Sequence, residues 1–167
     1  EPVTQATLSV VGAFLGLSRE RSNARRYPAI DPLLSWTKYV NNVGSEFGKG
    51  TEGWVDKVKN AGKMLRNGDE IEKRMEVVGE EGVVIEDMIT YLKSELYDFC
   101  YLQQNSFDRE DAYCPLKRQV PLFNLVCKIF DTDFEFKTHE EARNFFLNLQ
   151  NAIKNMNFMH FESQEYH

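Results

Sequence analysis

The chain has 167 residues, of which 42% are hydrophobic and 28% charged, and its formal net charge is −6. This length and composition are typical of one globular domain, with or without a short arm. They exclude a disordered chain, a collagen-like repeat and a disulfide-rich miniprotein. The excess of 26 acidic over 20 basic residues argues against nucleic acid as a partner, because phosphate binding needs basic side chains. No apolar run approaches the roughly 20 residues of a membrane-spanning helix, so we expect no direct membrane insertion.

The cysteines and histidines show no pattern of metal ligands. Cys100, Cys114 and Cys127 are far apart in the sequence, which fits buried thiols in a reducing compartment better than disulfides or a metal site. The three histidines lie near the C-terminus, without an HExxH motif or a cluster with cysteine. No serine or cysteine has the sequence context of a known nucleophile. We therefore predict no metal site and no catalytic residue in this chain.

The first 40 residues predict a helix followed by an extended segment. Apolar residues recur at helical spacing over residues 3–17. Pro28 and Pro32 then keep residues 27–31 out of helical geometry and impose a rigid, extended path. We expect a helix to begin again within residues 33–40.

The central part of the chain predicts three helices separated by short breaks. Residues 54–67 have helical periodicity, and Gly68 is a common type of C-terminal stop. Asp69 is then placed to cap a short helix over residues 70–78. Residues 85–104 carry apolar side chains at intervals of three and four and predict a long amphipathic helix.

The last third predicts two more helices after an irregular connection over residues 105–115. Pro115 suits the first turn of the helix that follows it. Thr138 and Glu141 form a capping box for the final helix. The predicted fold class is therefore mainly α, an all-α bundle of about five or six helices with an N-terminal arm.

Residues 44–53 contain four glycines and predict a loop that acts as a hinge. Within them, Gly48 to Gly53 reads G-x-G-x-x-G, the spacing of a dinucleotide-binding fingerprint. That fingerprint needs a preceding strand and a following βαβ unit, and the pattern predicts neither. A flexible loop is therefore the favoured interpretation.

A tight acidic turn is expected at residues 79–82, where Gly79 begins a Gly-Glu-Glu-Gly run. Together with two nearby acids it forms an acidic patch of Glu80, Glu81, Glu86 and Asp87. A solvated turn between two helices is the default interpretation of such a patch. The alternative is a contact with a basic partner.

Two aromatic residues, Tyr27 and Phe107, lie outside the predicted helix faces. Tyr27 belongs to the proline-framed segment, and Phe107 to a polar connection. Composition alone favours two residues at the edge of a core. Aromatic side chains held by loops also often cover a ligand, which makes both residues candidates for a binding site.

Five stretches of the chain resemble a known family. They are residues 1–8 (EPVTQATL), 25–30 (RRYPAI), 35–39 (SWTKY), 102–108 (LQQNSFD) and 113–119 (YCPLKRQ). In the same order, they resemble the C-terminal part of the catalytic A (alpha) subunit of V/A-type rotary ATPases. Val78 and Gly79, with the acids after them, resemble the helix turn between the third and fourth stretches. The resemblance extends to about Gln119.

The resemblance implies a domain organisation and an assembly. Residues 1–40 would be the end of the nucleotide-binding domain, and residues 41–167 the C-terminal helical domain. The family couples ATP hydrolysis or synthesis to proton or sodium transport, binds ATP or ADP with magnesium, and is cytoplasmic, peripheral on the membrane through the complex. Its partners would be the B subunits of the catalytic hexamer and the central rotor stalk.

The resemblance also implies roles for individual residues. Tyr27 and Phe107 match the two aromatics that lie against the adenine ring. The turn from Gly79 to Asp87 matches the region that meets the rotor. In the family, the phosphate-binding loop and the catalytic glutamate lie upstream of these segments. We therefore expect this chain to be part of a longer protein, to bind no nucleotide tightly by itself and to be inactive alone.

A second hypothesis needs no longer protein. In it, the chain is a free-standing helical interaction domain that binds a basic partner through the acidic turn. The mass of the native product would separate the two hypotheses, because only the first requires a polypeptide several times longer.

Overall fold

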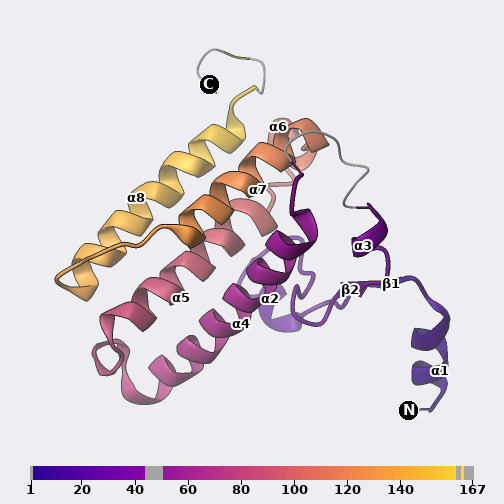
Figure 1. The fold of residues 1–167 in the computed structure, drawn as a ribbon, viewed down its shortest axis with the longest axis horizontal. Helices are drawn as coiled ribbons and strands as arrows, with labels where there is room; N and C mark the ends of the chain where they lie inside the picture. Colours follow the sequence, from indigo (N-terminus) through magenta and orange to yellow (C-terminus); the bar gives the residue numbers. More distant parts are fainter. Residues whose placement is uncertain (1, 44–50, 161–162, 164–167) are drawn as a thin grey trace. The chain divides into compact units, whose positions relative to one another are not determined.

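The computed structural model describes residues 2–43, 51–160 and 163. The chain divides into two compact units, Glu1–Gly62 and Lys63–His167, which are described one at a time. Over the described residues it is mainly α-helical, with one pair of two-residue strands (Figure 1). This confirms the predicted fold class, whereas the domain boundary expected at residue 40 stays a prediction. None of the described helices is both long and apolar enough to cross a membrane.

The first unit has a small antiparallel strand pair at its centre. In chain order its elements are α1 (Pro2–Val10), β1 (Ala13–Phe14), α2 (Arg19–Asn23), β2 (Trp36–Thr37), α3 (Val40–Val43) and the start of α4 (Trp54–Val78). In the strand pair, Ala13 lies opposite Thr37 and Phe14 opposite Trp36. Most of the glycine-rich loop expected at 44–53 falls on residues 44–50, which lie outside the described part.

The helix expected over residues 3–17 ends earlier, at Val10. The chain then turns into the strand pair, where the Lys38 amide donates to the Gly12 carbonyl at 2.8 Å. A Cβ atom at Gly12 would lie 2.3 Å from the Tyr39 hydroxyl, so a larger residue here would displace the exposed Tyr39 ring. Long-range strand pairing therefore replaces the second half of the predicted helix.

The helix expected to begin within residues 33–40 is also replaced by other structure. The Asp31 carboxylate accepts from the amides of Leu33 at 2.8 Å and Leu34 at 3.1 Å. This local turn offers the backbone an alternative to a helix. The residues after it form β2, and α3 begins only at Val40.

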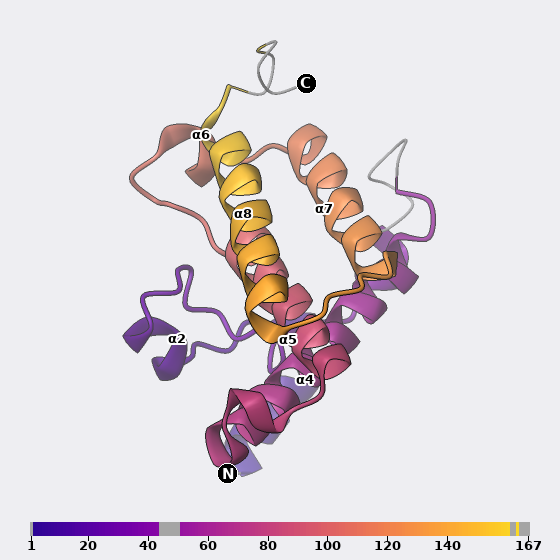
Figure 2. The ribbon, with the colours of Figure 1, turned by 90° about the vertical axis from the view of Figure 1, so that its left-hand side faces the viewer.

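The second unit is a helical bundle. Its elements are the rest of α4, the 3₁₀ turn η1 (Glu80–Gly82), α5 (Ile85–Tyr97), the π-helix η2 (Asp98–Leu102), α6 (Arg109–Ala112), α7 (Leu116–Asp131) and α8 (His139–Phe158). Figures 1 and 2 show α5 between α4 on one side and the α7–α8 pair on the other. Helix α5 contacts both α7 and α8. The buried apolar residues of α5 are Met88, Ile89, Leu92, Leu96 and Tyr97.

The predicted helix stop at Gly68 is wrong, because α4 runs through it to Val78. A Cβ atom at Gly68 would lie 2.3 Å from the Ser94 hydroxyl and 2.4 Å from its Cβ. The glycine therefore allows α4 to cross α5 closely, and it does not end the helix. Asp69 caps nothing at this position and instead pairs with Lys73 one turn later, at 2.8 Å.

The long helix expected over residues 85–104 changes character at Asp98. Regular α-helix ends at Tyr97, and the π-helix follows, with the Gln103 amide donating to the Asp98 carbonyl at 3.0 Å. π-helical turns are rare and occur often at functional sites.

Of the two hydrogen bonds of the capping box predicted for the final helix, the one accepted by Thr138 is confirmed. The Thr138 hydroxyl accepts from the Glu141 amide at 3.1 Å. The Glu141 carboxylate reaches back one residue further than expected, to the amide of Lys137 at 2.9 Å. Helix α8 therefore begins where the sequence predicts, at His139.

Candidate functional site

Tyr27 belongs to a loop of the first unit that is held by backbone hydrogen bonds. The Ser18 amide donates to the Ala29 carbonyl at 2.8 Å, and the Asp31 amide donates to the Gly16 carbonyl at 2.8 Å. These bonds confirm the extended path predicted for the segment. The Tyr27–Pro28 peptide bond is cis, and the Tyr27 side chain is 50% exposed.

Phe107 lies in the second unit, on the loop between η2 and α6. Its side chain is 99% exposed, so the rest of its unit leaves both faces of the ring uncovered. The prediction that it belongs to a core edge can therefore be set aside for this residue. An aromatic ring in this setting is free to stack on a flat ligand.

The loop that carries Phe107 is ordered by its own polar groups. The Asn105 side-chain oxygen accepts from the Phe107 amide at 3.1 Å. The Asp111 carboxylate accepts from the Asn105 amide at 2.6 Å, and the Asp108 carboxylate caps α6 by accepting from the Asp111 amide at 3.0 Å. Burial raises the pKa of Asp111, and the bond from Asn105 opposes that rise. The loop thus fixes the backbone from which the ring projects.

The two aromatic candidates lie in different units. Because each unit is described by itself, the expected pairing of the Tyr27 and Phe107 rings around one ligand stays a prediction.

At the start of the loop that carries Phe107, the buried side-chain nitrogen of Gln103 has no hydrogen-bond partner among the described residues.

The acidic turn connects α4 to α5. Gly79 has a φ of +79°, a left-handed conformation that favours glycine. The turn is held against α8 at Val83, whose carbonyl lies 3.0 Å from the His139 side-chain nitrogen Nε2.

The four acids of the turn fall into two classes. Glu80 pairs with Arg143 of α8 through two contacts, at 3.1 and 2.6 Å, and this hydrogen bonding raises the pKa of Arg143. Asp87 pairs with Arg74 of α4 at 2.9 Å. Glu81 and Glu86 are exposed. Glu80 is exposed as well, so its ion pair and not its burial distinguishes it from Glu81 and Glu86. The sequence pattern did not identify Glu80 and Asp87 as the paired acids, because their partners lie on other helices.

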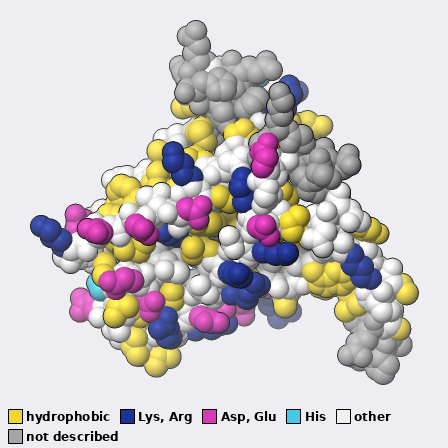
Figure 3. Space-filling model, viewed as in Figure 1, with side chains coloured by type: hydrophobic (Ala, Val, Ile, Leu, Met, Phe, Trp, Pro, Cys, Tyr) yellow, Lys and Arg dark blue, Asp and Glu magenta, His cyan; other side chains and the backbone are white. Residues whose placement is uncertain are grey.

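Apolar side chains are also exposed beside the turn. Val77, Val78 and Val84 line a groove of about 470 Å³, together with Arg74 and Asp87. Figure 3 shows hydrophobic side chains gathered at the lower left, where the α4–α5 turn lies. Exposed apolar groups rimmed by charge are typical of interaction surfaces. Sequence reasoning placed Val78 in the turn but did not identify Val77 and Val84, which lie at the ends of regular helices.

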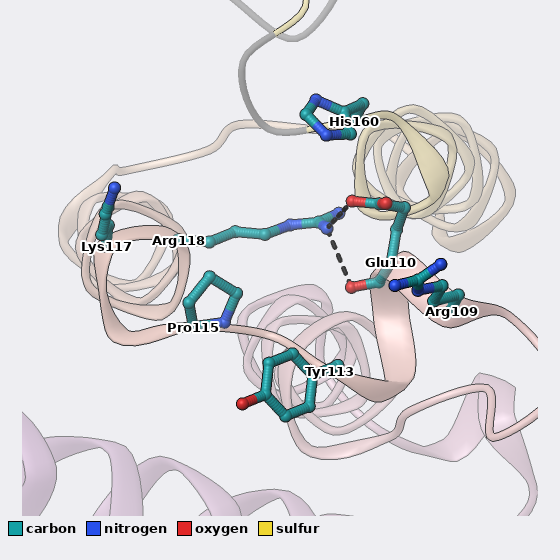
Figure 4. Close-up of a pocket in the computed structure, with 7 residues that line it drawn as sticks. All are labelled: Arg109, Glu110, Tyr113, Pro115, Lys117, Arg118 and His160. Atoms are coloured by element: carbon teal, nitrogen blue, oxygen red, sulfur yellow. Dashed lines mark hydrogen bonds and ion pairs between the residues drawn. The ribbon is translucent and has the colours of Figure 1, made fainter.

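A second cavity, of about 560 Å³, lies near the C-terminal end of α8. Its lining includes Arg109, Glu110, Tyr113, Lys117, Arg118 and His160. Figure 4 shows Arg118 extending from α7 toward Glu110. The Arg118 guanidinium donates to the backbone carbonyls of Glu110 at 3.0 Å, of Met156 at 3.2 Å and of Asn157.

Arg118 is only 1% exposed, and the nearest oxygen of the Glu110 carboxylate is 4.0 Å away. The guanidinium therefore serves mainly to satisfy backbone carbonyls, including two at the end of α8, where a cation is favoured by the helix dipole. Sequence reasoning missed this role, because no local pattern marks an arginine that binds carbonyls 38 and 39 residues away.

Within the described part of the chain, no group of three histidine, cysteine or acidic residues is arranged to hold a metal ion.

Comparison with known proteins gives a consistent result. Residues 46–143 match the family described as the C-terminal domain of V and A type ATP synthase. The chain is 69% identical to the V-type ATP synthase alpha chain of Protochlamydia amoebophila, over 99% of its own length. It is 60% identical to the protein of the same name from Chlamydia pneumoniae, over its whole length. The chain spans 28% of the length of each of these relatives.

Proposed function

The chain belongs to the V- and A-type ATP synthase alpha-chain family, and we propose that it is the C-terminal part of the catalytic subunit of such an enzyme. The similarity to alpha chains over 99% of the chain carries this proposal. Residues 1–40 would then end the nucleotide-binding domain, and residues 41–167 would form the helical domain. The whole subunit would hydrolyse or make ATP with magnesium, coupled to proton or sodium transport.

In this proposal the chain supplies one side of a nucleotide site and no phosphate-binding group. Its motifs include no phosphate-binding loop, and phosphoryl transfer needs a phosphate cradle and a metal ligand. The isolated chain would therefore be inactive and would bind ATP weakly. The assembled subunit would act at the cytoplasmic face of a membrane, beside B subunits and a central rotor stalk.

We propose that Tyr27 and Phe107 stack on the adenine ring. Two observations support this role: Phe107 is fully exposed on an ordered loop, and Tyr27 is half exposed on a segment held by backbone hydrogen bonds. Stacking of a base on an aromatic side chain contributes on the order of 1–3 kcal/mol. It would position the nucleotide without touching the phosphates.

In the full-length assembled enzyme, Phe107→Ala is expected to raise the KM for ATP roughly 5- to 100-fold, with a much smaller change in kcat. Stacking is made equally in the ground state and the transition state, so its loss weakens binding more than it slows chemistry. Tyr27→Ala should act in the same direction. Steady-state ATP hydrolysis measures both constants.

Tyr113→Ala is the matched control, because Tyr113 is another exposed aromatic of the same unit, on the cavity near the end of α8. Its KM for ATP should equal that of the unmodified enzyme. An unchanged KM in Phe107→Ala would show that this ring does not hold adenine.

We also propose that the turn from Gly79 to Asp87 meets the rotor. The ion pairs of Glu80 and Asp87 support the shape of the turn, so the charge available to a partner is that of Glu81 and Glu86. The exposed valines beside them add an apolar surface. A partner with basic and apolar groups fits this combination.

The double substitution Glu81→Lys with Glu86→Lys is expected to lower the number of ions pumped per ATP and to make coupling sensitive to salt. Placing positive charge against a basic rotor surface would weaken the contact without changing the KM for ATP. Ion uptake and ATP hydrolysis, measured together in vesicles at two ionic strengths, give the ratio. Glu70→Lys, an exposed acid in the middle of α4, is the control; equal ratios in both variants would mean that the turn is only solvated.

A further inference from the structure

We infer that Asn157 is a positioning residue for Phe107, because its side chain and its backbone hold the two ends of the loop that carries this ring. The inference rests on the proposed adenine-stacking role of Phe107. Asn157 lies in the last turn of α8 and is 6% exposed. Its hydrogen bonds join it to Cys100 and Arg118, so its effect on Phe107 would be indirect.

The upstream end of the loop is held by the side chain of Asn157. The π-helix ends at Leu102, and the backbone carbonyl of Cys100 accepts from the Asn157 side-chain nitrogen at 2.8 Å. The amide that would continue the π-helical pattern to Cys100 is that of Asn105, and it donates to Asp111 instead. Asn157 therefore satisfies a buried carbonyl at the point where the helix gives way to the loop.

A second contact joins the same turn of η2 to α8. The Cys100 thiol lies 3.7 Å from the Gln150 carbonyl, and burial raises the pKa of this thiol to about 12, so it stays protonated and can donate. The upstream end of the Phe107 loop is thus fastened to α8 at two places.

The downstream end of the loop reaches Asn157 through Arg118. Helix α6 begins two residues after Phe107, and its Glu110 carbonyl accepts from Arg118 at 3.0 Å. The same guanidinium donates to the backbone carbonyls of Met156 and Asn157. One arginine therefore joins α6 to the end of α8.

Both ends of the loop consequently converge on one residue. A change at Asn157 would release the carbonyl of Cys100 and disturb the carbonyl that Arg118 holds. The backbone around Phe107 would then be free to shift, and a stacked ring tolerates little displacement. The substitution at Asn157 would not need to move α4 or α5 where they carry the acidic turn.

The test uses the full-length enzyme in its assembled complex. Asn157→Leu keeps the number of side-chain heavy atoms but cannot donate. It is expected to raise the KM for ATP at least roughly 5-fold, while kcat changes less than about twofold. Asn157→Ala also lacks the donor and adds neither bulk nor charge, so it replaces the leucine variant if that one does not assemble.

Lys93→Met is the control for a purely structural loss. Lys93 is also buried on the second unit's bundle, and its ammonium donates to the carbonyls of Phe130 at 2.9 Å and Thr132 at 2.7 Å, at the far end of α7. Its replacement removes two side-chain hydrogen bonds away from the Phe107 loop, against the one that Asn157→Leu removes. Its KM for ATP should stay unchanged.

The double variant Asn157→Leu with Phe107→Ala separates this inference from the proposed function. If Asn157 acts through Phe107, the double variant has the KM of Phe107→Ala alone. A raised KM in Phe107→Ala with none in Asn157→Leu would overturn the inference and leave the stacking role intact. An unchanged KM in Phe107→Ala would overturn both the stacking role and the inference. If the two single-variant effects on KM multiply in the double variant, Asn157 does not act through Phe107, and the inference alone is overturned.

Discussion

Arg118→Met is expected to lower the free energy of unfolding of this chain by about 3–5 kcal/mol. The side chain is 1% exposed and donates to the carbonyls of Glu110, Met156 and Asn157. Methionine fills much of the same space but leaves these carbonyls without their donor, and each unsatisfied buried carbonyl costs about 1–3 kcal/mol. Urea denaturation followed by circular dichroism measures the loss.

Lys117→Met is the matched control for that substitution. Lys117 is the preceding residue on α7, carries the same charge and is exposed. Its replacement should change the free energy of unfolding by less than about 0.5 kcal/mol. Equal effects at the two positions would mean that the loss comes from net charge and that the carbonyl contacts of Arg118 add little.

Gly68→Ala is expected to destabilise the chain by about 1–3 kcal/mol, although alanine is the better helix former by about 1 kcal/mol. The added Cβ would lie 2.4 Å from the Ser94 Cβ, and a side-chain rotation cannot move that atom away. Helices α4 and α5 would have to separate at this point, which costs packing energy. The midpoint of thermal unfolding reports the change.

Ser94→Gly provides a direct test of this crowding. In the double variant Gly68→Ala with Ser94→Gly, both atoms that crowd the new Cβ are gone. The double variant should therefore recover most of the stability that Gly68→Ala alone loses. Additive destabilisation of the two changes would show that the crossing of α4 and α5 is not the reason for the glycine.

Helix α8 contacts both segments that we propose to be functional. Near its N-terminus, His139 and Arg143 hold the acidic turn at Val83 and Glu80. Near its C-terminus, Asn157 holds the turn that precedes the Phe107 loop. A movement of α8 relative to α5 would therefore reach both segments, which is one physical route for coupling between them.

Local chemistry in the sequence was sufficient for several features of the fold. The apolar periodicity over residues 85–104 predicted a long helix, of which residues 85–97 are α5 and residues 98–102 are π-helical. The pairing of Thr138 with Glu141 predicted the start of α8. Gly79 predicted the turn after α4, because its φ of +79° suits glycine. Each of these signals depends on residues within one or two helical turns, so neighbouring sequence contains all the information.

Only the tertiary structure decided the features that depend on distant partners. Gly68 has the local appearance of a helix stop, yet the close approach of Ser94 makes it a crossing point within α4. Glu80 and Glu81 are neighbours of the same type, yet only Glu80 lies opposite Arg143. The Asn157 side chain donates its hydrogen bond to the carbonyl of Cys100, 57 residues away. The sequence by itself determined the helical class, the start of α8 and which segments resemble an alpha chain. Packing decided where α1 and α4 end and which polar groups meet, because burial makes an unpaired polar group costly.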